Sequence, residues 1–201
     1  MHAATSTEAA PRRSASATRD RILEASSRLF YAQGIRATSA DRIIEEVGIT
    51  KVTFYRHFHT KSDLTVAYLV QQAAMERGWF ESARVPGEPV ASLRAIAAGI
   101  GTASCNPGFR GCAFINAAAE FADIDDPVRT TVNEHRAWML SEFASIAAEA
   151  GADDAEQVAR TLMMLRDGAM VNGYLGDADS VAESLAVGFD AALAAATRDD
   201  R

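Results

Sequence analysis

The chain has 201 residues, of which 48% are hydrophobic and 23% charged, a composition typical of a globular protein with one or two domains. No apolar run reaches the roughly 18 residues that a membrane-spanning helix needs. The arginines near the N-terminus are not followed by the apolar stretch of a signal peptide. These features argue against a membrane or secreted protein, and we expect a cytoplasmic one.

Charge is distributed unevenly along the chain, whose formal net charge is −7. Residues 1–65 contain ten Lys and Arg against seven Asp and Glu, a balance of +3. Residues 66–201 contain ten against twenty, a balance of −10. Contact with nucleic acid is therefore expected only in the basic first third, because the acidic remainder would repel phosphates.

The chain has two cysteines, Cys105 and Cys112. Two cysteines alone form neither a disulfide framework nor a zinc site. We interpret them as reduced, partly buried thiols, with a redox-sensing pair as the open alternative. His57 and His59 would point about 200° apart on a helix, so that no metal site is expected there. No cofactor is expected either.

The N-terminal segment, residues 1–17, is rich in Ser, Thr and Ala and is predicted to be a disordered arm. The first helix is predicted to begin near Thr18, a suitable N-cap, and to end at Gly34. Ile22 and Leu29, seven residues apart, belong to its apolar face.

Two short helices joined by a tight turn are predicted next. The first begins after Thr38, which has the spacing of a capping box with Asp41, and ends at Gly48. Thr50 can cap the second, predicted over residues 51–58. This is the anatomy of a DNA-binding helix-turn-helix, in which the second helix enters the major groove.

Six further helices are predicted in the acidic part of the chain. Apolar residues recur there at helical spacing, and turns rich in Pro, Gly and Asp separate the segments. No alternation typical of strands occurs, so the predicted fold class is all-α with nine helices. The six are expected from Thr60 to about Arg84 and at about residues 90–104, 112–121, 127–149, 153–175 and 178–196.

The segment 38–64, T-S-A-D-R-I-I-E-E-V-G-I-T-K-V-T-F-Y-R-H-F-H-T-K-S-D-L, closely resembles the DNA-binding signature of the TetR family of repressors. The length and the nine-helix arrangement also fit that family. The resemblance implies a helix-turn-helix head, residues 18–63, and a ligand-binding and dimerisation domain, residues 64–201. The matching residues are Thr38, Ile43, Val47, Gly48, Ile49, Thr50, Lys51, Phe54, Tyr55, His57, Phe58, Lys61 and Leu64.

Several of these residues are candidates for contact with DNA. Phe54 and Phe58, four residues apart, can anchor the recognition helix, which turns its N-terminal end outward. Many family members have glycine where Val52 stands, and its extra bulk is expected to shift base preference. The resemblance implies phosphate contacts by Thr38, Tyr55, His57 and Lys61. It implies base contacts by Lys51, Val52 and Thr53, and Arg42 is a further DNA-binding candidate.

The last two helices are predicted to form a homodimer interface. The eighth is apolar on two sides, and a helix apolar on two sides is buried on two sides. TetR relatives pair these helices with their symmetry mates in a four-helix bundle, which would place two heads on a palindrome. A monomer that buries both apolar stripes is the alternative. The residues assigned to the interface are Val158, Leu162, Leu165, Val181, Leu185, Gly188 and Ala192.

A pocket for a small molecule is expected among the fourth to eighth helices, as in the family. Aromatic and Met residues gather there with a few polar ones, which is the composition of a ligand pocket. For each residue, a place in the core or on the surface is the alternative. The candidates are Met75, Trp79, Phe114, Asn116, Glu120, His135, Trp138, Met139, Met163, Asp167 and Met170.

The sequence therefore predicts a repressor that binds a palindromic operator as a homodimer and is released by a small apolar or amphipathic effector. A DNA-binding regulator without an inducer is the alternative. An all-helical enzyme with His135 and either Glu120 or Asp167 as acid and base is a third hypothesis. No nucleophile motif, metal cluster or phosphate loop supports it, so no catalytic residue is assigned.

Overall fold

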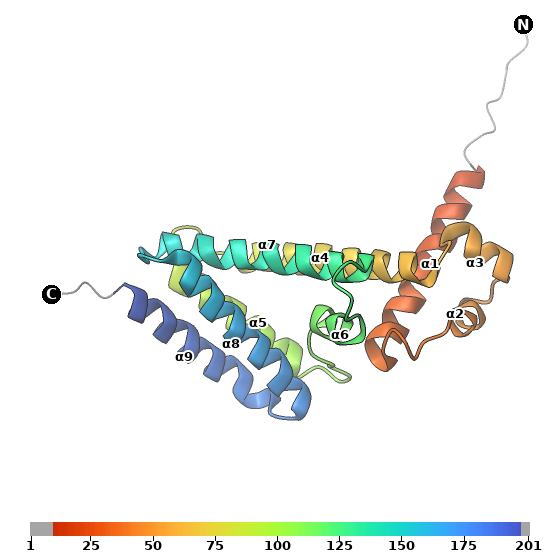
Figure 1. The fold of residues 1–201 in the computed structure, drawn as a ribbon. Helices are drawn as coiled ribbons and strands as arrows, with labels where there is room; N and C mark the ends of the chain where they lie inside the picture. Colours follow the sequence, from red (N-terminus) through yellow and green to blue (C-terminus); the bar gives the residue numbers. More distant parts are fainter. Residues whose placement is uncertain (1–9, 198–201) are drawn as a thin grey trace, which may run out of the picture. The chain divides into compact units, whose positions relative to one another are not determined.

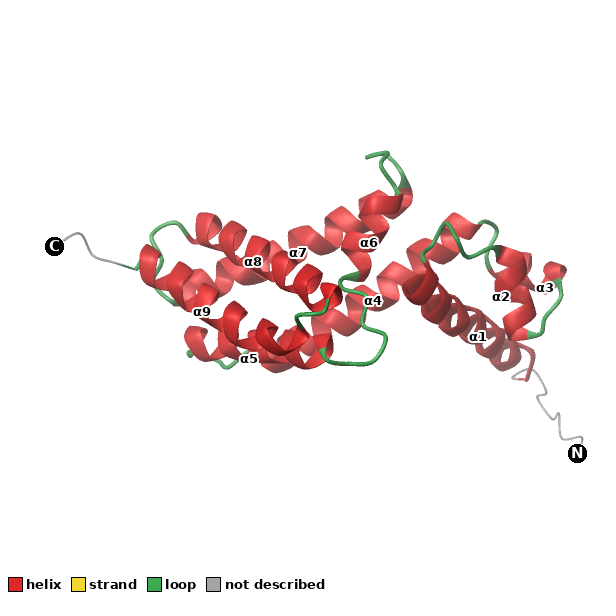
Figure 2. Ribbon diagram, turned by 90° about the horizontal axis from the view of Figure 1, so that it is seen from below, coloured by secondary structure: helices red, strands yellow, loops and turns green. Residues whose placement is uncertain are grey.

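A computed structural model describes residues 10–197 of the chain, and within them it contains nine α-helices and no strand (Figure 1, Figure 2). The predicted all-α class is confirmed. No helix in this range is long and apolar enough to cross a membrane. The helices are α1 (Ala10–Gln33), α2 (Ala40–Val47), α3 (Lys51–His57), α4 (Lys61–Ala83), α5 (Pro89–Ser104), α6 (Ala113–Glu120), α7 (Pro127–Glu149), α8 (Ala155–Leu175) and α9 (Ala178–Ala196).

The start of α1 differs from the prediction. The helix begins at Ala10 rather than near Thr18, so the prediction of disorder is wrong for residues 10–17. This stretch combines Ala and Arg, which favour helix, with Pro11, which is tolerated in a first turn. The remainder of the predicted arm, residues 1–9, lies outside the described residues.

The chain divides into two compact units, residues 1–68 and 69–201, and the boundary lies within α4 rather than after residue 63. The first unit holds α1, α2, α3 and the beginning of α4, around a core that includes Ile22 and Ile43, both fully buried. The Phe30 ring packs edge-on against Tyr68, with centroids 5.6 Å apart.

Local hydrogen bonds explain where the short helices of this unit begin. The N-cap of α2 is Ser39, whose side chain accepts a hydrogen bond from the backbone N–H of Arg42. The predicted cap at Thr38 was therefore one residue early. Thr50 caps α3 as predicted, and Thr60 and Asp63 form the predicted capping box at α4, with both hydrogen bonds 3.0 Å long.

The second unit is a bundle of packed helices. α5 packs on α9, and α8 packs on both α7 and α9, as Figure 1 shows. The fully buried Phe143 contacts Phe80 and Phe189 edge-on, with ring centroids 5.7 and 5.8 Å apart. Both cysteines are free; Cys105 is exposed and Cys112 is buried.

The residues predicted to form a dimer interface lie largely inside one chain. Four of them are at most 5% exposed, because they form the faces on which α8 and α9 pack within the unit: Val158, Leu162, Val181 and Leu185. Gly188 also contacts its own chain, since a Cβ there would lie 3.3 Å from Cδ1 of Leu165. Ala192 is half-buried. The four buried residues therefore pack within one chain and offer little surface to a partner.

A different apolar surface of the same two helices is exposed. Met164, Val171 and Leu175 follow one face of α8 and are 67%, 45% and 74% exposed. Val187 on α9 is 64% exposed. The sequence pattern did not identify this exposed face, because none of Met164, Val171 and Leu175 is among the residues assigned to the interface.

Candidate nucleic-acid interface and internal cavity

The helix α3 presents one side to solvent because its other side is anchored in the core. Phe54 is fully buried and Phe58 is 3% exposed, and their ring centroids lie 6.4 Å apart. On the outer side, Val52 is 78% exposed and Tyr55 is 42% exposed. The predicted anchoring of this helix is therefore confirmed, and its first turn is accessible to a ligand as large as DNA.

The residues predicted to face bases lie on this accessible turn. Lys51 is exposed and its ammonium group lies 2.9 Å from the carboxylate of Asp41. The hydrogen bond and the negative charge of Asp41 raise the pKa of Lys51. Thr53 is half-buried, and its hydroxyl lies 3.0 Å from that of Thr50. Lys51 would have to leave Asp41 to reach DNA, and an exposed ion pair is weak. The hydroxyl of Thr53 would likewise have to exchange its contact with Thr50.

The residues predicted to contact phosphates differ in how far they are buried. Thr38 is only 1% exposed, and its hydroxyl donates to the backbone carbonyl of Gly34 at 2.9 Å. The hydroxyl thus holds the loop after α1 in place and does not face solvent. His57 is half-buried, and Lys61 is half-buried with Nζ 3.4 Å from the carbonyl oxygen of Arg36.

Two further arginines on the surface of this unit bear on DNA binding. Arg42 is exposed and lies 3.3 Å from Glu45 and 3.5 Å from Glu46. Arg56, which sequence reasoning missed, is exposed on α3. It follows Val52 by four residues, so the spacing of the helix was a signal that could have placed it on the same face.

The second unit contains a cavity of about 270 Å³. Four of the eleven predicted ligand residues line it: Met75, Trp79, Met139 and Met170. Phe80 and Phe143, which also line it, belong to the aromatic cluster that the sequence placed in this region. Sequence reasoning missed the other six lining residues, which come from α4, α5 and α8: Glu76, Ile96, Gly99, Ile100, Ala103 and Arg166. The cavity thus lies in the region where a ligand pocket is predicted, and the polar residues that line it, Glu76 and Arg166, are not among the predicted ones.

The seven remaining candidates do not line this cavity. The ring of Phe114 stacks on His135 with centroids 3.7 Å apart, and Trp138 packs edge-on against Phe80. Asn116 donates to the backbone carbonyl of Arg110 at 2.8 Å. All seven form the core or the surface around the cavity: Phe114, Asn116, Glu120, His135, Trp138, Met163 and Asp167.

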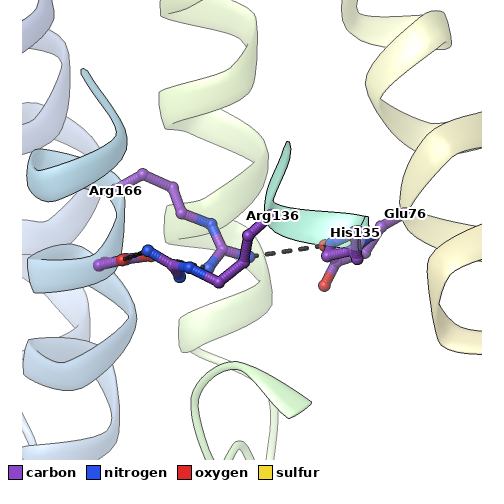
Figure 3. A network of polar contacts seen from close by, with 5 residues as sticks. Glu76, His135, Arg136 and Arg166 are labelled. Atoms are coloured by element: carbon purple, nitrogen blue, oxygen red, sulfur yellow. Dashed lines mark hydrogen bonds and ion pairs between the residues drawn. The ribbon is translucent and has the colours of Figure 1, made fainter. Parts of the chain in front are cut away.

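A polar network adjoins the apolar walls (Figure 3). Nε2 of His135 lies 2.8 Å from Oε2 of Glu76, and Nη2 of Arg166 lies 3.5 Å from the same oxygen. Nη1 of Arg166 lies 3.2 Å from Asp167, whose other oxygen accepts a hydrogen bond from Arg136 at 2.7 Å. Two carboxylates and two guanidinium groups therefore alternate along the network.

Arg166 is the most buried charged residue of this network, with 4% of its surface exposed. Burial disfavours its charged form, but the neighbouring Cys112 and the carboxylates of Glu76 and Asp167 outweigh that effect. They hold the pKa of Arg166 above its usual value. The guanidinium group therefore stays charged and fixes the carboxylates around it.

The arrangement gives no support to the enzyme hypothesis. The carboxylate that contacts His135 belongs to Glu76, and neither Glu120 nor Asp167 is its partner. Nδ1 of His135 is buried without a hydrogen-bond partner among the described residues. The imidazole is stacked on Phe114 and only 2% exposed, which leaves no room for a substrate against it.

Two family profiles match the chain. Residues 22–68 match that of bacterial regulatory proteins of the tetR family, and residues 89–189 match the C-terminal domain of tetracyclin-repressor-like proteins. Among curated proteins, an 81-residue segment is 37% identical to the HTH-type transcriptional regulator AcrR of Shigella flexneri. A 61-residue segment is 43% identical to an HTH-type transcriptional regulator of Staphylococcus aureus. These matches span 38% and 32% of the two relatives' own lengths.

Solved structures resemble the whole chain. A TetR-family transcriptional regulator from Streptomyces coelicolor is 40% identical, with a TM-score of 0.86 over 91% of this chain and 97% of that one. A TetR-type transcriptional regulator from Streptomyces avermitilis is 25% identical, with a TM-score of 0.75 over 87% of this chain and 97% of that one. The similarity therefore includes both compact units.

Proposed function

The chain belongs to the TetR family of bacterial regulatory proteins, and on this premise we propose that it is a ligand-released transcriptional repressor. In this proposal it binds a palindromic operator as a homodimer and leaves the operator when a small molecule fills the cavity. The observation that carries the proposal is the presence, in one chain, of an exposed recognition helix and an apolar cavity with a buried charged wall.

The DNA-binding part of the proposal rests on α3. Its exposed side chains at Lys51, Val52 and Tyr55 offer a cation, an apolar contact and a hydroxyl on one accessible surface. Lys can donate to the O6 and N7 atoms of guanine, and Val52 can contact a thymine methyl group. Tyr55, Arg56 and Lys61 would contact phosphates and set the position of the helix on the duplex.

The homodimer rests on the exposed apolar face of α8 and α9 described above, which contains Met164, Val171, Leu175 and Val187. Large apolar side chains that share one exposed face mark a surface that associates with another protein. We propose a second copy of the chain as that protein, because two heads would then read two half-sites about one helical turn of DNA apart.

Release would be transmitted through α4. This helix begins at Lys61, next to the recognition helix in sequence, and its Met75 and Trp79 line the cavity. A ligand that shifts the Met75–Trp79 segment can change the separation of the two heads. It does so only if it binds the non-operator state more tightly than the operator state.

One experiment tests these elements together. An operator is first selected from random DNA with the full chain, and the stoichiometry of the complex is measured by analytical ultracentrifugation. A library of small molecules is then screened for release of that operator. We expect two chains per palindromic site and release by a mostly apolar compound. Specific binding with no releasing compound would favour a regulator without an inducer.

A further inference from the structure

The cavity has one charged wall. Glu76 on α4 and Arg166 on α8 are its only charged lining residues, and the rest of the lining is one glycine and side chains that are apolar apart from the indole N–H of Trp79. A polar group of a ligand must therefore lie against one of the two charged residues or the indole N–H, because a polar group left without a partner in an apolar site costs binding free energy. Of these groups only the carboxylate of Glu76 can supply an acceptor, because an indole N–H and a guanidinium group donate.

The charges at this wall are already balanced. Figure 3 shows Glu76 and His135 close together at one end of the network, with the side chains of Arg136 and Arg166 extending beside them. The ion pairs of Arg166 with Glu76 and Asp167, and of Arg136 with Asp167, place two guanidinium groups against two carboxylates. A charged ligand would lose its hydration in the cavity without finding an uncompensated opposite charge.

In the part of the chain that the structure describes, one of the two carboxylate oxygens of Glu76 is left without a hydrogen-bond partner. Both of its contacts, with His135 and with Arg166, use the single oxygen Oε2. Within residues 10–197, Oε1 forms no hydrogen bond or ion pair, and the side chain is 25% exposed. The two terminal nitrogens of Arg166, by contrast, both face carboxylate oxygens. The free site at the wall is therefore an acceptor.

We propose that this cavity selects an uncharged, largely apolar molecule whose polar group donates a hydrogen bond to Oε1 of Glu76. The proposal rests on the proposed function, in which the cavity holds the effector. An anionic ligand would have to displace Glu76 from Arg166, and His135 holds Glu76 in place. A cationic ligand would meet Glu76 but also the positive charge of Arg166 beyond it.

Four compounds with one naphthalene skeleton test the selection on the full-length protein at neutral pH. 2-(1-Naphthyl)ethanol is an uncharged donor, and its methyl ether lacks the donor. 2-(1-Naphthyl)ethylamine is a cation, and 3-(1-naphthyl)propanoate is an anion. Dissociation constants are measured by isothermal titration calorimetry. We expect the alcohol to bind most tightly, with the ether roughly ten-fold weaker, because the hydrogen bond to a carboxylate is lost.

The variant Glu76→Gln should shift the preference of the cavity from the alcohol toward the anionic propanoate. It keeps a similar side-chain shape but leaves one positive charge at the wall uncompensated. We expect the propanoate to bind the variant roughly ten-fold more tightly than it binds the wild type, and the alcohol to bind more weakly. The matched control is Glu81→Gln, which removes the same charge from an exposed position on α4 outside the cavity and should leave the ranking unchanged.

The outcomes separate this inference from the proposed function. Tightest wild-type binding by the amine or the propanoate, or binding by none of the four, overturns the inference. That ranking does not depend on whether Glu76→Gln folds. Operator release is measured separately with the selected DNA. If the alcohol binds through Glu76 but does not release DNA, the repressor mechanism fails and the ligand class stands. If an ionised compound releases DNA from the cavity, the mechanism stands and the ligand class fails.

Discussion

The indole ring of Trp79 occupies the space that a side chain at Gly99 would need. A Cβ at Gly99 would lie 2.5 Å from Cζ2 of Trp79 and 3.0 Å from Cε2. Both residues line the cavity, and Trp79 is 37% exposed. Because Gly99 on α5 has no side chain, the indole ring of Trp79 on α4 can pack against α5 and form this part of the cavity wall.

The substitution Gly99→Ala should therefore displace Trp79 and weaken ligand binding. The helix gains about 1 kcal/mol from replacing glycine, which offsets the strain of moving a ring that can swing outward. We expect little change in stability but a red-shifted Trp79 fluorescence, recorded in a Trp138→Phe background. Gly78→Ala, at a position with nothing within 4 Å of the added Cβ, is the control and should leave the spectrum unchanged.

Arg56 should contribute to operator binding as a phosphate contact. Replacement by alanine is expected to weaken binding to all sequences alike and to flatten the slope of log affinity against log salt by about one unit per lost contact. Arg160→Ala, an exposed arginine on α8, is the matched control. Fluorescence anisotropy over a salt series measures both slopes, and identical slopes for Arg56→Ala and wild type would remove Arg56 from the interface.

Thr38 shows that the packing of a loop, which a sequence signature does not describe, decides where a side chain points. The hydroxyl of Thr38 is buried against the carbonyl of Gly34, although its place in the signature suggested phosphate contact. Its neighbour Ser39, one position later, is exposed and caps α2. A threonine and a serine side by side give equal cap signals in a sequence. Only the packing of the loop decides which one turns inward.

Dimer formation should depend on the exposed face of α8 and α9. Leu175→Glu places a charge where a partner chain would bury it, and an unpaired buried charge costs several kcal/mol. We expect the dissociation constant of the dimer to rise roughly a hundred-fold or more, together with loss of operator binding. Ile124→Glu is the matched control, because Ile124 is 60% exposed in the loop between α6 and α7. Sedimentation velocity would contradict the assignment if Leu175→Glu remained dimeric.

The helices were predictable to within a few residues because their ends depend on nearby residues. Gly48, for example, ends α2 with a φ of 69°, a backbone conformation that glycine adopts without strain. The cavity was predictable only in outline. Glu76 and Arg166 lie on helices far apart in the sequence, and no local pattern indicates that they meet. An apolar stripe on α8 likewise has the same spacing whether it packs inside the chain or against a partner.

Arg166 should be essential for the stability of the second unit. Arg166→Met leaves Glu76 and Asp167 without their shared guanidinium group, and breaking a buried ion pair from one side costs about 3–5 kcal/mol. The partial exposure of both carboxylates should reduce the loss toward about 3 kcal/mol. Arg160→Met, at an exposed pair with Glu156, should cost no more than about 0.5 kcal/mol. Urea denaturation measures both, and equal losses would refute a structural role of the network.

Ligand and operator should each weaken the binding of the other by the same factor, because both act on one equilibrium between two states of the dimer. The ligand lowers operator affinity only to the extent that it prefers the state that does not fit the operator, and a ligand with equal affinity for both states shifts nothing. The measurement is a pair of titrations with a releasing compound, one into the free dimer and one into the dimer–operator complex. We expect weaker ligand binding in the complex, by the same factor by which saturating ligand weakens operator binding.

Trp79→Ala provides the matched variant, since it removes a side chain of the cavity wall that lies outside the first compact unit. It should lower ligand affinity and leave ligand-free operator affinity nearly unchanged. Equal ligand affinity in both titrations would rule out ligand-driven release, even for a compound that fills the cavity.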